Sequence, residues 1–139
     1  MERSTRQRHS IRSVLEAAGR PLLPSEILAE AQRDVPALGL ATVYRNIKQL
    51  IDAGEIQAVE LPGEHPRYEL AGHQHHHHFQ CRTCDRVFDV HACPGDMRKL
   101  APHGFIVEDH ELTLYGVCVD CQSRSRQQAP SPSPKAPQS

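Results

Sequence analysis

The chain has 139 residues, of which 38% are apolar, 4% are aromatic and none is tryptophan, and its formal net charge is −1 at pH 7. This length allows one ordinary domain or two small ones, and the scarcity of aromatic residues argues against one large aromatic core. No run approaches the roughly 18 apolar residues of a membrane-spanning helix, and charges recur near the start, so we expect neither a membrane protein nor a secretory precursor. In the soluble cytoplasmic chain that we expect, ten histidines and five cysteines indicate metal binding before disulfides.

The first part of the chain predicts two short amphipathic helices. Apolar residues spaced as i, i+3, i+4 and i+7 over Ile11–Ala18 predict the first helix, with Ser4 or Thr5 as its N-cap and Gly19 at its end. The segment Pro24–Ala31 predicts the second, because proline suits a first helical turn and the apolar residues after it share one face.

A third helix carries the most informative pattern. Its buried stripe is predicted to contain Val43, Ile47, Leu50 and Ile51, and Gly54 ends it. At 100° per residue, the opposite face carries Ala41, Arg45, Lys48 and Gln49, with Tyr44 at its edge. Strands over Glu55–Leu61 and Arg67–Leu70 then flank a turn rich in proline and glycine. Three helices followed by a hairpin predict a winged helix.

The second part of the chain predicts short strands around one short helix, so the fold class is α+β. The expected strands are His76–Gln80, Arg86–Val90 and Glu111–Val117, and the helix lies near Asp96–Leu100. From Ser123 onward the chain has no apolar pattern and repeats Ser-Pro, which predicts a disordered tail. We therefore divide the chain into residues 1–66, 67–122 and 123–139.

Two Cys-x-x-Cys pairs predict a structural zinc site. Cys81 and Cys84 form the first pair, and Cys118 and Cys121 form the second. Two such turns supply the four sulfurs of tetrahedral zinc, whose binding adds about 10 kcal/mol or more to folding and would compensate for a small core. The alternatives are a redox dithiol and buried cysteines without a ligand. Cys93 is left over.

A run of histidines directly precedes the first cysteine pair. If it forms a strand, alternation sends His76 and His78 to one face and His75 and His77 to the other, so the run can serve two metal sites. The alternatives are a cloning tag, although tags are usually terminal, and a solvated polar strand.

Together these motifs resemble the ferric uptake regulator family of metal-dependent repressors, most closely its zinc uptake regulator branch. The resemblance runs from about Thr5 to Cys121 and rests on four segments: Gly39–Ile47, Tyr68–Leu70, the histidine run with its cysteine pair, and His110 followed by Leu114–Cys121. It implies a winged-helix DNA-binding domain with a hinge over residues 1–66 and a zinc-bearing α/β dimerisation domain over residues 67–122. It also implies a homodimer, with a sensing metal near the hinge.

The resemblance also implies ligand sets. The structural zinc ligands are Cys81, Cys84, Cys118 and Cys121, and the sensing ligands are Glu69, His76, His78 and Asp89. The family commonly adds a histidine from the start of the second helix, where this chain has Pro21–Pro24 and no ligand. A second regulatory site would use His75, His77 and His110 with either Cys93 or Asp96. We expect His9, His65, His91 and His103 to be surface or packing residues.

DNA contacts are expected from the third helix and from arginines near the N-terminus. Tyr44 and Arg45 would reach bases and phosphates, supported by Thr42 and Lys48, while Arg6, Arg8 or Arg12 would contact the backbone or the minor groove. The alternative for Arg45 and Lys48 is a solvated helix face. Residues 1–61 hold eight basic and eight acidic residues, so contacts must come from placed side chains and not from a diffuse field.

These features predict a metal-responsive repressor that binds operator DNA and controls metal uptake genes. Imidazole and thiolate ligands at low coordination number favour regulatory Zn²⁺ beside the structural Zn²⁺, over Fe²⁺ or Mn²⁺. An iron-responsive regulator and a zinc-storage or interaction module without DNA binding remain alternatives. A zinc hydrolase such as a nucleobase deaminase is disfavoured, because the chain has neither His-x-Glu nor Pro-Cys-x-x-Cys.

Overall fold

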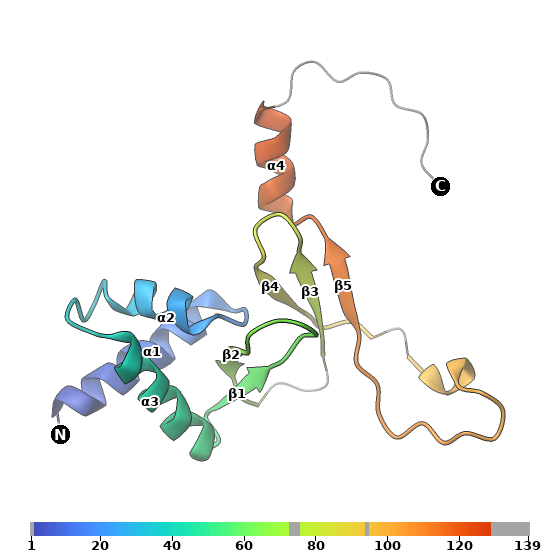
Figure 1. Cartoon of the computed structure of the whole chain (residues 1–139), viewed down its shortest axis with the longest axis horizontal. Helices are drawn as coiled ribbons and strands as arrows, with labels where there is room; N and C mark the ends of the chain where they lie inside the picture. Colours follow the sequence, from blue (N-terminus) through green and yellow to red (C-terminus); the bar gives the residue numbers. More distant parts are fainter. Residues whose placement is uncertain (1, 73–75, 94, 129–139) are drawn as a thin grey trace.

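A computed structural model describes residues 2–72, 76–93 and 95–128 as two halves (Figure 1). The helical half, residues 2–70, contains α1 (Glu2–Ala18), α2 (Pro24–Ala31), α3 (Leu40–Asp52), β1 (Ile56–Val59) and β2 (Arg67–Leu70). The sheet half, residues 76–128, contains β3 (His77–Cys81), β4 (Val87–Val90), the 3-10 helix η1 (Met97–Leu100), β5 (Thr113–Gly116) and α4 (Val119–Gln128). Within the described ranges, no helix is both long and apolar enough to cross a membrane.

The helical half is a winged helix with a single apolar core. The core is made of Ile11, Leu15, Leu22, Ile27, Ala31, Leu38, Val43, Ile47, Leu50 and Ile56. The hairpin β1–β2 is attached to the helices through Leu22, whose backbone N–H and C=O pair with those of Tyr68 at 2.9 and 2.8 Å. The hairpin and α3 therefore belong to one packed unit.

The sheet half has the strand order β4-β3-β5, with β3 antiparallel to β4 and parallel to β5. Phe79 of β3 lies opposite Phe88 and Leu114 on the two neighbouring strands. A Cβ atom on Gly116 would lie 3.0 Å from the Phe79 ring, so only glycine allows this approach directly before the second cysteine pair. The helix α4 then leads away from the sheet (Figure 1).

The two halves meet along the wing. Val59 and Leu61 form a small buried cluster with Val87 of β4, so apolar side chains from both halves pack together. The β1–β2 ladder ends at the pair Val59 and Arg67, so β1 stops before the Leu61 boundary that the sequence pattern predicts.

Two predictions for the helices of this half are wrong. α1 begins at Glu2, ahead of Ser4 and Thr5, because residues 2–10 contain no helix breaker and arginines on its first turns contact Asp34 and Gln49. Ile51 is 38% exposed and does not belong to the buried stripe. It lies 100° around the helix from Leu50, which takes the buried position.

Two corrections concern the division of the chain. β2 pairs with β1 and with Leu22, so the boundary between the halves lies after Leu70 and not after Pro66. α4 continues through Gln128, five residues past the predicted start of the tail at Ser123, because the second cysteine pair opens the helix and no proline interrupts it there. The remaining expected tail, residues 129–139, lies outside the described residues.

Candidate metal centres and candidate DNA-binding helix

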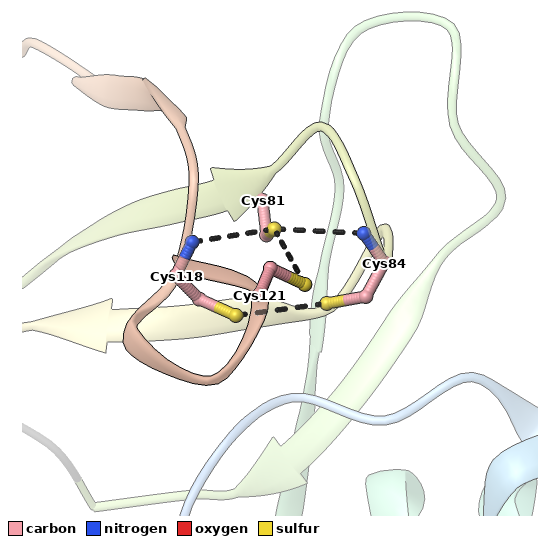
Figure 2. Close-up of side chains that lie close together, drawn as sticks. All are labelled: Cys81, Cys84, Cys118 and Cys121. Carbon is pink, nitrogen blue, oxygen red and sulfur yellow. Dashed lines mark hydrogen bonds between the residues drawn. The ribbon is translucent and has the colours of Figure 1, made fainter. Parts of the chain in front are cut away.

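The two Cys-x-x-Cys pairs converge on one point, as Figure 2 shows. Cys81 ends β3, Cys84 lies in the turn after it, and Cys118 and Cys121 flank the start of α4. The Sγ atoms of Cys81 and Cys121 are 3.8 Å apart, and those of Cys84 and Cys118 are 3.9 Å apart. Zinc–sulfur bonds of about 2.3 Å in a tetrahedron require sulfur separations of about 3.8 Å. This four-cysteine group therefore has the dimensions of a closed structural zinc site.

Donors around the sulfurs favour thiolates. The backbone N–H groups of Cys118 and Cys84 point at Cys81 Sγ from 3.3 and 3.5 Å and lower the pKa of that thiol to about 6. Burial raises the pKa of Cys84, but the Arg86 guanidinium, with Nε 3.1 Å from its sulfur, outweighs burial and lowers that pKa. Burial raises the pKa of Cys121 to about 12. Zinc binding must therefore displace protons from part of the group.

A second group lies at the junction of the two halves, and we call it the hinge group. It consists of Glu69 on β2, His76 and His78 at β3, and Asp89 on β4, whose ligand atoms all lie within 4.8 Å of one another. His76 Nε2 is 3.1 Å from both Glu69 Oε2 and Asp89 Oδ1. Three buried atoms, Glu69 Oε1, His78 Nε2 and Asp89 Oδ1, make no hydrogen bond to described residues. Buried polar atoms that converge without hydrogen bonds fit a cation.

The charges of the hinge group are strongly coupled. Burial raises the pKa of Glu69, but contacts with His78 and Gln57 outweigh burial and lower the pKa to about 2. Burial lowers the pKa of His78, but Asp89 at 3.4 Å and Glu69 at 3.9 Å raise it to about 9. Without metal, the protonated His78 imidazole therefore supplies the positive charge between the Glu69 and Asp89 carboxylates.

Sequence reasoning missed one residue beside the hinge group. Gln57 of β1 lies opposite Glu69 in the hairpin and donates a 2.9 Å hydrogen bond to Glu69 Oε2. The hairpin register would have pointed to Gln57. His91, which we expected to be a surface or packing residue, is exposed, and its ring centroid lies 5.8 Å from that of His76.

A third group contains one thiol and two imidazoles. Cys93 Sγ lies 3.4 Å from His77 Nε2 and 3.5 Å from His110 Nε2. Asp96, the alternative to Cys93, is not part of this group among the described residues, because its carboxylate caps η1 and pairs with Arg98 at 2.9 Å. His75, the other expected member, lies outside the described residues. A cavity of about 250 Å³ is lined by histidines of both the third group and the hinge group.

Alternation along β3 separates these groups as the sequence predicts. His76 and His78 belong to the hinge group, whereas the neighbouring His77 is 2% exposed and contacts Cys93 of the third group. A strand places successive side chains on opposite faces. The same short run of histidines therefore contributes to two candidate metal centres.

The exposed face of α3 carries the residues expected to contact DNA. Tyr44, Arg45 and Lys48 are exposed, with Tyr44 at 51%, and Thr42 accepts a 3.1 Å hydrogen bond from Arg45. The arginines of α1 already have intramolecular contacts: Arg6 with Asp34 O, Arg8 with Gln49 and Arg12 with Glu55. The structure therefore presents α3 outward and holds the α1 arginines on the protein surface.

The profile of the Ferric uptake regulator family matches residues 2–115. The chain belongs to the ferric uptake regulator family. It is 31% identical over 126 residues to the ferric uptake regulation protein of Campylobacter jejuni, covering 86% of this chain and 80% of that protein. It is 30% identical over 125 residues to the peroxide-responsive repressor PerR of Staphylococcus saprophyticus, covering 88% and 84%. The structure of the Helicobacter pylori ferric uptake regulator, described as having three functional metal-binding sites, matches with a TM-score of 0.64 and 26% identity over 84% of this chain and 79% of that one.

Membership of the ferric uptake regulator family confirms the family resemblance seen in the sequence motifs, but not the zinc uptake regulator branch. The family consists of metal-responsive transcriptional regulators that bind operator DNA, so the chain is a transcriptional regulator and not an enzyme. The two relatives are named for ferric uptake and for peroxide at nearly equal identity. The comparisons therefore leave the metal that this family member senses to the chemistry of its own residues.

Proposed function

We propose that this ferric uptake regulator-family protein is a zinc-responsive, homodimeric repressor of metal uptake genes that acts in the cytoplasm. The observation that carries the choice of zinc is the thiol of Cys93 between two imidazoles, His77 and His110, at 3.4 and 3.5 Å. Thiolate and imidazole at low coordination number suit zinc, whereas iron(II) and manganese(II) favour sites rich in oxygen ligands. We assign this third group as a second regulatory site.

The hinge group is our candidate for the sensing site. Its two imidazoles and two carboxylates supply four ligands, and a metal there would tie Glu69 of the helical half to His76 and His78 of the sheet half. The segment before and at the start of α2, Pro21–Pro24, has no side chain that could bind a metal, and its Leu22 is 2% exposed in the core. Four ligands permit the tetrahedral geometry common for zinc. The four-cysteine group would hold a separate structural zinc.

The homodimer would form through the outer edge of β5. This strand lies at the edge of the sheet, and no described strand pairs with its outer side. Leu114, Tyr115 and Val117 along it are 43–46% exposed, and Phe105 and Ile106 of the preceding loop are 70% and 88% exposed. An unpaired strand edge beside exposed apolar side chains favours pairing with a second copy of the chain. Two copies would present two α3 helices to the two halves of an operator.

Operator binding measured against buffered metal tests the proposal. Protein that retains only its structural zinc should bind operator DNA when zinc(II) reaches picomolar to nanomolar levels. Arg45→Ala should weaken this binding by about 1–3 kcal/mol per half-site if the contact with guanine is bidentate, without changing the metal content. Lys48→Ala should act more uniformly across DNA sequences and reduce the salt dependence.

Three outcomes would contradict parts of the proposal. Activation by micromolar iron(II) under anaerobic conditions, without a response to zinc, would make the protein an iron-responsive regulator. Metal binding without any operator binding would indicate a storage or interaction module. Equal operator affinity of Arg45→Ala and the parent would remove Arg45 from the recognition surface.

A further inference from the structure

The wing carries a fully buried arginine that contacts the other half of the molecule. Arg67 on β2 is 2% exposed, although arginine is rarely buried to this extent unless it is paired. One guanidinium nitrogen donates to Glu64 Oε1 at 3.1 Å, and the other donates to the backbone carbonyl of Asp85 at 2.8 Å. Asp85 directly follows Cys84 in the sheet half. A side chain of the DNA-binding half is thus bonded to the turn that carries the first cysteine pair.

The turn that offers this carbonyl has a defined shape. Asp85 has φ of 64°, a left-handed conformation that is uncommon outside glycine, and its N–H donates to Cys81 O at 2.8 Å. The N–H of Cys81 in turn donates to Arg86 O at 3.0 Å. The backbone around Cys81 and Cys84 is therefore closed on itself, and it holds the Asp85 carbonyl toward the wing.

A second contact reinforces the same junction. Gln80 lies next to Cys81 on β3 and is 7% exposed. It donates a 3.1 Å hydrogen bond to Glu64 Oε1, the same oxygen that accepts from Arg67. Glu64 lies in the exposed turn of the wing. Arg67, Glu64 and Gln80, together with the Asp85 carbonyl, form a connected polar junction between the halves, which we call the wing junction.

Arg67 and Glu69 share one face of β2, because strand side chains alternate. The burial pattern of β2 agrees, since residues 67 and 69 are its two buried positions. Glu69 belongs to the hinge group, and Arg67 contacts the turn that carries Cys81 and Cys84. One short strand of the DNA-binding half therefore supplies a member of the hinge group and, two residues earlier, a contact to the turn of the four-cysteine group.

We propose that Arg67 is a positioning residue that couples the four-cysteine group to the orientation of the winged helix. This proposal rests on the proposed function, because it assumes that metal at the hinge group promotes operator binding. The wing junction holds β2 against the sheet half before sensing metal arrives, so Glu69 already lies near His76 and His78. A four-cysteine group holding zinc would then maintain the turn that anchors the DNA-binding half, in addition to stabilising the sheet.

Weakening the wing junction should lower the fraction of molecules in which Glu69 is in place. The apparent affinity of a ligand falls in proportion to the fraction of protein in the competent state. Because operator binding is coupled to zinc binding, a lower zinc affinity at the hinge group should raise the zinc concentration that operator binding requires. Binding at saturating zinc should recover, since zinc draws the population back to the competent state.

Arg67→Met tests this inference, because it keeps much of the side-chain volume and removes both hydrogen bonds. We expect one structural zinc per chain to remain and the zinc concentration for half-maximal operator binding to rise by about tenfold or more. Hydrogen exchange in protein that holds only structural zinc should increase in segments 61–72 and 82–87 but not in 24–31. Arg33→Met is the control, since Arg33 has an 80% exposed side chain and should leave both measurements unchanged.

Glu64→Ala is the second variant and covers the case in which Arg67→Met fails to fold. It alters only an exposed turn, frees both Arg67 and Gln80, and should shift both measurements in the same direction by a smaller amount. Parental zinc dependence, within twofold, together with parental exchange in a folded variant would overturn the inference. If the parent itself shows no zinc-dependent operator binding, the proposed function fails, and the exchange measurement alone decides whether the wing junction holds the halves together.

Discussion

Zinc binding at the hinge group should displace a proton from His78. The zinc affinity of the hinge group should therefore depend on pH. In the metal-free protein, Asp89 and Glu69 raise the pKa of His78 to about 9, against an ordinary value of 6.5. The proton and the metal compete for the same imidazole, and metal ligands must be deprotonated. Raising the pH removes the competing proton, so the zinc affinity of the hinge group should increase with pH.

The expected size follows from this pKa. A single competing proton divides the zinc affinity by 1 + 10 raised to the power (pKa − pH). With a pKa of about 9 for His78, the zinc affinity should rise about eightfold between pH 7.5 and 8.5. An ordinary histidine would give a gain below about 1.2-fold over the same range, since it is already neutral there. About one proton per zinc should be released from His78 at pH 7.5.

Two measurements check this prediction in protein that holds only its structural zinc. Calorimetric zinc titrations in buffers of different ionisation enthalpy count the released protons, and competition with a chelator of known pH dependence gives the affinity. Imidazole nitrogen resonances, with His78→Gln used to assign the His78 signal, report its pKa directly. An affinity that changes less than twofold between pH 7.5 and 8.5, or an imidazole that titrates near 6.5, would refute the reasoning.

Three further predictions concern the cysteine-containing groups. Cys81→Ser should unfold the sheet half and abolish dimers, because the substitution opens a zinc site that supplies much of the folding free energy. Size-exclusion chromatography with zinc quantitation checks this prediction. A dimeric variant with undiminished zinc would contradict it. Arg86→Gln should weaken zinc retention by about 10- to 100-fold in chelator competition, because it removes the guanidinium 3.1 Å from Cys84 Sγ. Its control is Arg82→Gln, whose guanidinium stacks on Tyr115 instead. Cys93→Ser should remove one zinc per chain from the third group, and unchanged stoichiometry would exclude Cys93 as a ligand.

Local patterns in the sequence were enough to predict much of this protein. Helical periodicity identified α2 with its observed bounds, because amphipathic spacing and a proline in the first turn act within a few residues. The same locality applies to the cysteine pairs and to the histidine run, where alternation along a strand separates His76 and His78 from His77. The family could be named because its motifs combine several such local features.

Relations between distant segments were decided by the tertiary structure. Whether Cys93 or Asp96 joins His77 depends on how the loop around η1 folds back. In the structure Cys93 contacts His77, whereas the Asp96 carboxylate accepts from the backbone N–H of Arg98 and pairs with the Arg98 guanidinium. The exposure of Ile51 depends on which neighbours pack against α3. Spacing along the chain does not encode these choices, because the competing arrangements have the same local pattern.

The contact between the two halves is the clearest example of a relation that the sequence pattern does not predict. Arg67 and Asp85 are separated by 18 positions, and the sequence pattern marks neither as a partner of the other. Only the pairing of β2 with Leu22 and the closed turn after Cys81 bring the guanidinium to the carbonyl. The sequence by itself determined most of the elements, apart from α4 and several element bounds, together with the cysteine and histidine motifs and the family. The tertiary structure decided which residues meet, because burial and hydrogen bonding between remote segments are satisfied only in the packed fold.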